Sequence, residues 1–352
     1  DVEVGSDADP NPAAPQEPNT GLIDLSADAG GGPGRWMGGD LHCHTLHSDG
    51  RNTVEQIVLS AIERGLEFLA VTDHNTVTHH AELERLSHLP IVLIPGEEVT
   101  TYYGHTNAWG LAGRWVDFRC VDGPGIRAIA EFVLSQGGLC SVNHPKGPGS
   151  NWRFETAAGY PCMEVWQAPW QHRNWESVAR WEHEVAAGQR IVMVGGSDVH
   201  SIPPAPPLHP HGLGNPTTWV YVRGAPSPSS VLEGIRRGHA FISADPSGPR
   251  IELTAHADGD TQTGMAGDAL HLEDDRPIRV RARVSGASGK YLCLIADGND
   301  FSRLYLSRDD ETQEMWLHPG GRRYVRAEVR DHGAGESATV WAMSNPIWFE
   351  RG

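Results

Sequence analysis

Seven short patches of His, Asp and Glu, almost all directly behind a strand-like apolar run, constrain this chain more than any other feature of its sequence. In chain order they are Asp40-Leu41-His42-Cys43-His44, Ser48-Asp49-Gly50, Thr72-Asp73-His74, Gly96-Glu97-Glu98, Gly104-His105, Asn143-His144-Pro145 and Gly196-Ser197-Asp198-Val199-His200. Imidazole and carboxylate groups bind ions such as zinc, manganese and iron. Parallel strands present their carboxyl ends at one shared edge, so the patches predict a polynuclear metal site there.

Strand and helix signals alternate in the first two thirds of the chain. Thr53 and Gln56 form a capping-box pattern, followed by apolar residues with helical spacing. Strand-like runs are expected at 66–71, 91–94, 139–142, 163–166 and 191–194, and further helices at 124–136, 174–187 and 229–237. This alternation predicts parallel βαβ units, and ligands at the strand ends predict a barrel.

The pattern changes near residue 245. Segments 250–255, 278–284, 291–296, 323–329 and 338–343 alternate in polarity or are rich in β-branched residues, and turn residues separate them. We therefore expect three regions: a flexible leader at 1–35, rich in Asp, Pro, Ala and Gly; an α/β barrel at 36–245; and a small antiparallel, sandwich-like β-domain at 246–352.

Charge and hydropathy limit the partners that we expect. The chain carries 45 acidic and 28 basic side chains, a formal net charge of -17, which disfavours a nucleic acid as partner. No apolar run approaches the length of a membrane span. We therefore expect no nucleic-acid partner and no membrane span, and the predicted hydrolytic metal site adds the expectation of a small-molecule ester substrate. A start at Asp1 without Met is compatible with an exported protein whose signal peptide was removed, and equally with a cytoplasmic protein or a trimmed chain.

The ordered patches resemble the PHP (polymerase and histidinol phosphatase) superfamily over residues 39 to 200. The stretches Tyr324-Val325-Arg326-Ala327-Glu328 and Ser344-Asn345-Pro346-Ile347 resemble its CehA/McbA branch, in which a PHP domain precedes a small β-domain. The resemblance implies a distorted (β/α)7 barrel with two or three divalent metal ions, Zn, Mn or Fe, in its mouth. It places one metal ion on His42, His44, Glu98 and Asp198, a second on Glu98, His105 and His144, and a third on Asp49, His74 and His200. Asp49 departs from members of the family that have His at this position.

Spacing agrees with that assignment. Alternate residues of a strand share one face, so His42 and His44 can reach one ion, as can Asp198 and His200. A hydroxide bridging two ions would be the nucleophile. Asp198, His200 and His74 are the predicted catalytic residues, because His200 or His74 could deliver a proton to the leaving group if the third site were empty.

Two alternatives stay open among the ligands and their neighbours. Glu97 could replace Glu98 as the bridging carboxylate. Asp73 and Asn75, which flank His74, are interpreted as turn residues or as partners of ligands.

A run rich in Trp follows one of the predicted strands. Trp166, Trp170, Trp175 and Trp181 could form an aromatic wall for the substrate or could pack inside the barrel. Lys146 and Arg173 are the cations best placed to bind a phosphate. The predicted substrate contacts are Lys146, Arg173, Trp170 and His172.

Three classes of function follow. A phosphoesterase acting on a small phosphomonoester or phosphodiester is favoured, because two ions can hold both the attacking and the leaving oxygen of a phosphoryl transfer. A carboxyl or carbamate ester hydrolase of the CehA/McbA type is the alternative, since the same hydroxide can attack a carbonyl. A catalytically inactive PHP-like binding module is the third class.

Overall fold

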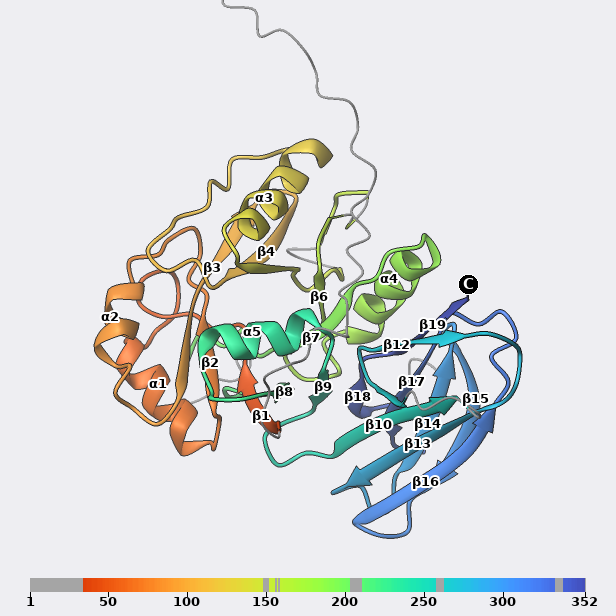
Figure 1. The fold of residues 1–352 in the computed structure, drawn as a ribbon. Coiled ribbons are helices and arrows are strands. Elements are labelled where there is room, and N and C mark those ends of the chain that lie inside the picture. The colour runs from red at the N-terminus through yellow and green to blue at the C-terminus, as the bar shows by residue number, and fades with distance from the viewer. Residues whose placement is uncertain are drawn as a thin grey trace, which may run out of the picture.

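The computed structural model describes residues 34–147, 152–155, 157, 159–202, 211–257, 263–332 and 338–351 (Figure 1). The predicted leader at 1–35 lies outside the described residues apart from Gly34 and Arg35, and Arg35 already belongs to the first strand. Among the described residues, no helix is long and apolar enough to cross a membrane.

The first two thirds of the chain form a mixed α/β unit. Its strands are β1 (Arg35–Asp40), β2 (Phe68–Val71), β3 (Val92–Thr101), β4 (Gly104–Trp109), β5 (Leu139–Val142), β6 (Cys162–Gln167), β7 (Val192–Gly196), β8 (Thr217–Val222) and β9 (Ala240–Ser243). Its helices are α1 (Val54–Glu63), α2 (His80–Arg85), α3 (Gly123–Ser135), α4 (Asn174–Ala186) and α5 (Pro228–Arg236). The predicted helices and strands of this unit are present, and most of their ends differ by one or two residues. Strand β3 is the exception, because it continues to Thr101, seven residues past the predicted end, and Glu98 therefore lies within it rather than behind it.

Helix α1 begins where the sequence predicts. The Thr53 hydroxyl accepts the Gln56 N–H, and the Gln56 side chain accepts the Thr53 N–H, which completes the capping box. One face of the helix is buried through Val54, Ile57 and Val58. Burial of this face fixes the segment that follows the first predicted ligands.

The sheet is not built from parallel pairs alone. Strands β1, β2 and β3 pair in parallel, as do β5, β6 and β7, but β3, β4 and β5 are antiparallel, and β8 pairs antiparallel with β1. Only Tyr102 and Tyr103 separate β3 from β4, and a connection that short can only form a hairpin. The predicted (β/α)7 barrel therefore stays unconfirmed, although the α/β class is correct.

The segments after β7 and β1 meet. Cys43 and Val199 form an isolated parallel bridge, the Asp198 N–H donates to the His42 carbonyl at 2.8 Å, and the His44 N–H donates to the Val199 carbonyl at 2.9 Å. The segment after β7 is thereby joined to the segment after β1, at the edge that carries the predicted ligands.

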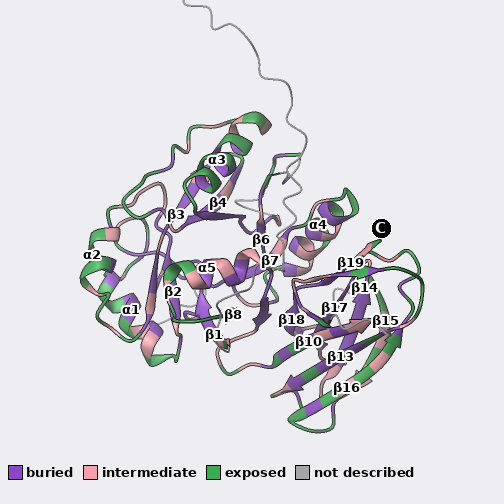
Figure 2. Cartoon of the chain, in the orientation of Figure 1, coloured by how far each residue is buried: buried purple, intermediate pink, exposed green. Residues whose placement is uncertain are grey.

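The remaining strands form a β-rich region beside α4 (Figure 1). They are β10 (Arg250–Ala257), β11 (Thr263–Met265), β12 (Ala269–Leu272), β13 (Ile278–Ser285), β14 (Tyr291–Ala296), β15 (Asn299–Tyr305), β16 (Asp310–Leu317), β17 (Tyr324–Arg330), β18 (Val340–Ser344) and β19 (Ile347–Arg351). A four-stranded sheet of order β11-β10-β13-β16 packs against strands of the large sheet around a core of its own, which includes Ile251, Val280 and Val329. Figure 2 shows buried residues in these strands, with exposed residues on the outward-facing strand β16.

The large sheet continues across the predicted domain boundary near residue 245. Strand β18 pairs antiparallel with β9, which in turn pairs with β8. Hydrogen bonding between strands thus joins the two regions, and no separate boundary is visible in the sheet. The division into domains at 36–245 and 246–352 therefore stays a prediction.

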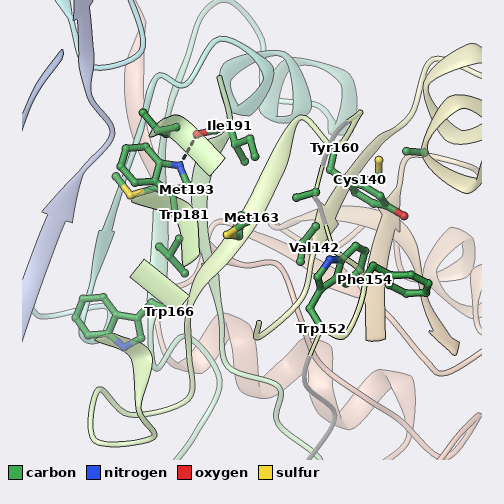
Figure 3. Packing of buried hydrophobic residues seen from close by; sticks show 14 of the residues in the cluster. Cys140, Val142, Trp152, Phe154, Tyr160, Met163, Trp166, Trp181, Ile191 and Met193 are labelled. Carbon is green, nitrogen blue, oxygen red and sulfur yellow. Dashed lines mark hydrogen bonds between the residues drawn. The ribbon is translucent and has the colours of Figure 1, made fainter. Parts of the chain in front are cut away.

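Three of the four tryptophans of the predicted aromatic wall are buried in the core. Trp166 and Trp181 pack among the buried residues of one large cluster, and the Trp181 indole N–H donates to the Ile191 carbonyl at 2.7 Å (Figure 3). Trp170 makes an edge contact with Trp166, with 5.0 Å between ring centroids. Trp175 is partly buried against the same cluster. These tryptophans therefore pack inside the protein, as the second of the two sequence interpretations expects, and do not form an aromatic wall.

Candidate metal centre

All nine predicted ligands converge at one edge of the α/β unit. His42 and His44 follow β1, Asp49 lies in the loop after them, His74 follows β2, Glu98 and His105 lie on β3 and β4, His144 follows β5, and Asp198 and His200 follow β7. Four groups of His, Asp and Glu place ligand atoms within 4.8 Å of one another: His44, Asp49, His74 and His200; His42, His44, Glu98 and Asp198; His42, His144 and Glu164; and His74, Glu98 and His105.

The Cys43–Val199 bridge aligns two of the ligand pairs. His42 and His44 flank Cys43, whereas Asp198 and His200 flank Val199. Cys43 and Val199 are buried in an apolar cluster. All four flanking residues belong to the groups of neighbouring ligand atoms. The His-x-His and Asp-x-His motifs lie just beyond β1 and β7, and the bridge between them brings their ligands into one site.

Glu98 lies at the centre of the site and is fully buried. Its Oε1 lies 3.1 Å from His105 Nδ1 and 3.3 Å from His144 Nε2. Its Oε2 lies 3.3 Å from His42 Nε2, 3.5 Å from His44 Nε2 and 2.9 Å from His74 Nδ1. The two oxygens of one carboxylate therefore face two sets of imidazoles, which is the arrangement expected of a bridging ligand.

Glu97 points elsewhere. Its Oε2 accepts the Val116 N–H at 2.8 Å, outside the four ligand groups. Burial raises the pKa of Glu97 to about 7. Of the two adjacent glutamates, Glu98 is the one placed in the site.

Asp198 faces the first pair of histidines. Its Oδ1 lies 2.9 Å from His44 Nε2 and 3.3 Å from His42 Nε2, and Gln167 Nε2 donates to its Oδ2 at 2.9 Å. Burial would raise the pKa of Asp198, but His42 and His44 hold it well below its ordinary value. The carboxylate is therefore available as an anionic ligand.

Asp49, His74 and His200 form the outer part of the site. Asp49 Oδ1 lies 3.2 Å from His200 Nε2 and 3.5 Å from His74 Nε2. The hydrogen bond with His200 lowers the pKa of Asp49 to about 2. The Asp49 side chain is 59% exposed, whereas the Glu98 side chain is 0% exposed, so this group is the most open to solvent.

The donor set fits divalent ions. His42 Nε2 and Glu98 Oε2 are buried, make no hydrogen bond within the described part of the chain, and face each other across 3.3 Å. Buried polar atoms without partners are costly, and a shared cation would satisfy both. Burial also lowers the pKa of His44 to about 4, which keeps its imidazole in the neutral form that binds metals.

Backbone strain is concentrated around the site. Asn75, His144, Arg173 and Asp198 have positive φ angles of 51°, 27°, 60° and 54°, and together they make up four of the six such non-glycine residues in the described ranges. Residues keep such conformations only where their surroundings enforce them. Asn75, predicted to be a turn residue, exchanges two hydrogen bonds with the backbone of Thr100, which faces His74.

Asp40 and Asp73 support the loops that carry the ligands. Asp40 is buried and accepts the backbone N–H groups of His42, Ser197 and Gly214. Asp73 accepts the Thr45 N–H, the Thr45 hydroxyl and the Ser48 hydroxyl, which fixes the loop leading to Asp49. The sequence interpretation of Asp73 as a non-ligand agrees with this placement.

A pocket of about 500 Å³ opens beside the ligands. The residues that line it are Asp49, His74, Glu98, His105, His144, Lys146, Gly147, Gln167, Gln171, His172, Arg173, Asp198 and His200. Lys146, His172 and Arg173, predicted to contact substrate, thus lie in its wall. Lys146 Nζ donates to the Gln167 carbonyl at 3.0 Å and to Asn174 Oδ1 at 2.6 Å, so its ammonium is held at the N-terminus of α4.

Trp170 corrects the prediction for substrate contacts. It does not line the pocket, and its indole N–H donates to the Ala338 carbonyl of the β-rich region at 2.9 Å. A bulky aromatic ring near an active-site loop fits the core as well as a pocket, and sequence spacing does not distinguish the two environments.

Sequence reasoning missed Glu164 and Gln167. Both lie on β6, and Glu164 accepts a hydrogen bond from His42 Nδ1 at 2.8 Å. The signal for Glu164 was a carboxylate inside the apolar run Met163-Glu164-Val165-Trp166, because a buried acidic residue nearly always has a dedicated partner.

Comparisons with known proteins bear on the same region. Residues 40–118 match the model of the PHP domain. The phosphoribosyl 1,2-cyclic phosphate 1,2-diphosphodiesterase of Eggerthella lenta is 39% identical over 64 residues, 18% of this chain and 24% of that protein. The 5'-3' exoribonuclease Rnm of Escherichia coli is 44% identical over 68 residues, 18% of this chain and 23% of that protein. The chain thus matches about a quarter of the length of either relative.

A solved structure extends the likeness in fold. A two-domain protein from Bacteroides vulgatus, which contains a predicted PHP-like metal-dependent phosphoesterase, superposes with a TM-score of 0.51 at 15% identity, covering 90% of this chain and 95% of that one. At this identity the likeness is one of fold alone. The narrower resemblance to the CehA/McbA branch stays a prediction. From the domain match and the ordered ligand patches, we conclude that residues 40–118 of this chain are similar in sequence to the PHP domain.

Proposed function

We propose that this protein is a metal-dependent hydrolase that cleaves phosphoesters. The observation that carries the proposal is Glu98, whose buried carboxylate faces His105 and His144 with one oxygen and His42, His44 and His74 with the other. A bridging carboxylate of this kind is what a hydrolytic site with two neighbouring ions requires.

We assign the nine predicted ligands to three sets, which draw on the four groups of neighbouring ligand atoms. His42, His44, Glu98 and Asp198 would hold one ion, Glu98 with His105 and His144 a second, and Asp49, His74 and His200 a third. Divalent ions bound there would lower the pKa of a water molecule and neutralise charge on the ester. The N/O donor set suits zinc, manganese and iron alike, so the identity of the ions is left to measurement.

The part of the pocket wall that is not formed by predicted ligands would bind the substrate. Lys146, His172 and Arg173 line it, and Lys146 is directed by Gln167 and Asn174. Side chains rich in N–H groups favour an anionic group such as a phosphate, and burial lowers the pKa of Lys146 to about 7, so Arg173 is the permanent cation of the three. His74 and His200, which both contact Asp49, are the groups available to move a proton at the leaving oxygen.

The substrate class includes small phosphomonoesters and phosphodiesters. A short RNA also belongs to the candidates, because one relative is a 5'-3' exoribonuclease and another is a cyclic phosphate diphosphodiesterase. The sequence prediction that excluded nucleic acid rested on net charge alone and gains no support. Charge averaged over the chain does not describe a pocket wall that carries Lys146 and Arg173.

A substrate panel tests the proposal. Metal-analysed protein would be assayed with an aryl phosphomonoester, an aryl phosphodiester, a 5'-phosphorylated RNA oligonucleotide, and aryl carboxyl and carbamate esters. His144→Ala removes a ligand. The matched control is His88→Ala, which changes an exposed histidine whose ring, among the described residues, bonds the Arg85 carbonyl alone.

The outcomes distinguish a phosphoesterase from a carboxyl or carbamate ester hydrolase and from a protein without hydrolase activity. Metal-dependent turnover of a phosphoester, lost in His144→Ala and kept in His88→Ala, supports the proposal. Turnover of carboxyl or carbamate esters alone would replace it with the carbonyl-ester alternative. A wild-type protein that hydrolyses nothing after zinc, manganese and iron have each been supplied would contradict both.

A further inference from the structure

Glu164 joins ligands of two different proposed metal sites. This residue of β6 is 2% exposed. Its Oε1 lies 2.8 Å from His42 Nδ1, and its Oε2 accepts the backbone N–H of His144 at 3.0 Å. His42 belongs to the first set of ligands and His144 to the second, so one carboxylate contacts a ligand of each.

The contact with His42 determines which ring nitrogen can bind an ion. A carboxylate accepts hydrogen bonds, so Glu164 keeps the proton of the imidazole on Nδ1. The lone pair of Nε2 is then directed at Glu98 Oε2 and Asp198 Oδ1, each 3.3 Å away. His42 Nε2 is the atom that is buried without a hydrogen bond, as expected for a metal ligand.

The contact with His144 holds a strained backbone. His144 has a φ of 27°, which a residue with a side chain adopts only when its surroundings impose it. The hydrogen bond from its N–H to Glu164 is one contact that holds this conformation, in which Nε2 lies 3.3 Å from Glu98 Oε1.

Gly196 leaves room for the carboxylate. A Cβ at this position would lie 2.8 Å from Glu164 Oε1 and 2.4 Å from His42 Cβ, closer than real contacts allow. Glu164 therefore reaches His42 only because the strand beside it ends in glycine. Gly196 is two residues before the ligand Asp198, so the segment that leaves room for Glu164 also carries a ligand.

We propose that Glu164 is a positioning residue that couples two metal sites, so that loss of its carboxylate weakens metal binding at both. The inference rests on the metal sites of the proposed function and does not depend on which reaction the protein catalyses. Carboxylates that orient metal-binding histidines typically contribute about 10–100-fold in metal affinity.

Two substitutions distinguish positioning from mere burial. Both partners of Glu164 are donors, so Glu164→Gln can satisfy only one of them and turns an NH₂ group toward the other. Glu164→Asp keeps two acceptor oxygens on a shorter side chain. Glu97→Gln is the matched control, because Glu97 is also 2% exposed and accepts a backbone N–H, but lies outside the ligand groups.

Metal affinity is the readout. Zinc binding to wild type, Glu164→Gln, Glu164→Asp and Glu97→Gln would be measured by competition with a chromogenic chelator, with circular dichroism as the test of folding. We expect Glu164→Gln to weaken at least two binding steps by about 10–100-fold, Glu164→Asp to recover part of this loss, and Glu97→Gln to match wild type. The visible spectrum of the cobalt-loaded Glu164→Gln protein should also differ from that of wild type.

Each result decides the inference. Unchanged affinity in folded Glu164→Gln, or a loss confined to one step, overturns it. If Glu164→Gln does not fold, ¹⁵N NMR of histidine-labelled wild type decides instead: a His42 ring protonated on Nε2 overturns the role, and one protonated on Nδ1 supports it. A wild type that binds no divalent ion overturns this inference together with the proposed function, whereas one that binds ions without hydrolysing esters contradicts the proposed function alone.

Discussion

The side-chain amide of Asn345 hydrogen-bonds both backbone groups of Met193. The Met193 N–H donates to Asn345 Oδ1 at 2.8 Å, and Asn345 Nδ2 donates to the Met193 carbonyl at 2.9 Å and to the Ala240 carbonyl at 3.1 Å. Asn345 lies in the β-rich region, whereas Met193 lies on β7, which leads to Asp198. The amide thus completes the hydrogen bonding of a strand that carries part of the metal centre.

Asn345→Ala should therefore destabilise the whole α/β unit. It leaves the N–H and C=O of Met193 buried without partners, and each such group costs ~1–3 kcal/mol. We expect the free energy of unfolding to fall by about 2–4 kcal/mol, measured by urea unfolding. Asn299→Ala is the control, because Asn299 is exposed and its side chain, within the described part of the chain, bonds the Asp297 carbonyl alone. Equal stabilities of the two variants would contradict the role of Asn345.

Local sequence patterns predicted the parts of the site that depend on local structure. A short apolar run followed by His or Asp placed ligands correctly just after β1, β2, β5 and β7. Glu98 and His105 instead lie within β3 and β4, and Asp49 lies in a loop, yet all nine predicted ligands converge. Capping at Thr53 was predictable for the same reason, since it depends on residues three positions apart.

Features that depend on distant contacts could not be predicted in this way. Glu164 lies inside a strand without a flanking motif, and its partners His42 and His144 are 122 and 20 residues away in sequence. Trp170 bonds Ala338, 168 residues away. The antiparallel direction of β4 follows from the hairpin at Tyr102 and Tyr103, a pair without the Gly or Asn that usually signals such a turn.

Removal of metal ions should lower thermal stability. Glu98 is fully buried among five histidines, and ions that bind only the folded protein stabilise it by mass action. At ion concentrations ~100-fold above Kd, the stabilisation is about 2.7 kcal/mol. We expect chelation to lower the unfolding midpoint by several degrees and zinc to restore it. An unfolding midpoint that changes neither with chelator nor with zinc would contradict a metal centre.

Loss of the exposed ligand Asp49 and loss of the buried ligand Glu98 should lower the number of bound ions by different amounts. Asp49→Ala changes an exposed ligand of one group, so we expect it to lower the number of bound ions by about one and leave the rest. Glu98→Gln changes the carboxylate shared by two sets, so we expect it to remove about two ions or more. Elemental analysis after gel filtration measures both numbers. Equal losses in the two variants would contradict the central position of Glu98.

Trp170→Phe should affect substrate binding without removing a substrate contact. The variant loses the hydrogen bond to Ala338 that anchors the segment carrying His172 and Arg173, both in the pocket wall. Loss of one such bond costs about 1 kcal/mol, so we expect KM for the best ester of the panel to rise about 5-fold with kcat within 2-fold. Steady-state kinetics of Trp170→Phe and of Trp316→Phe, an exposed tryptophan on β16, test this. A loss of kcat alone would contradict the assigned role.

Glu328 should govern part of the stability in acid. Its buried carboxylate pairs with Arg326 and Arg330, and these cations outweigh burial and hold the pKa of Glu328 below its ordinary value of 4.5. A carboxylate with a lowered folded-state pKa contributes stability that is present above pH 4.5 and is lost as the pH falls through the folded-state pKa. Glu328→Gln should therefore be less stable than wild type at pH 7, by about 3–5 kcal/mol, and the gap should narrow toward pH 3. Urea unfolding at pH 7, 5 and 3 measures it, with Glu314→Gln, in an exposed pair with Arg281, as the control. A gap that stays constant over this range would show that the charge of Glu328 does not stabilise the fold.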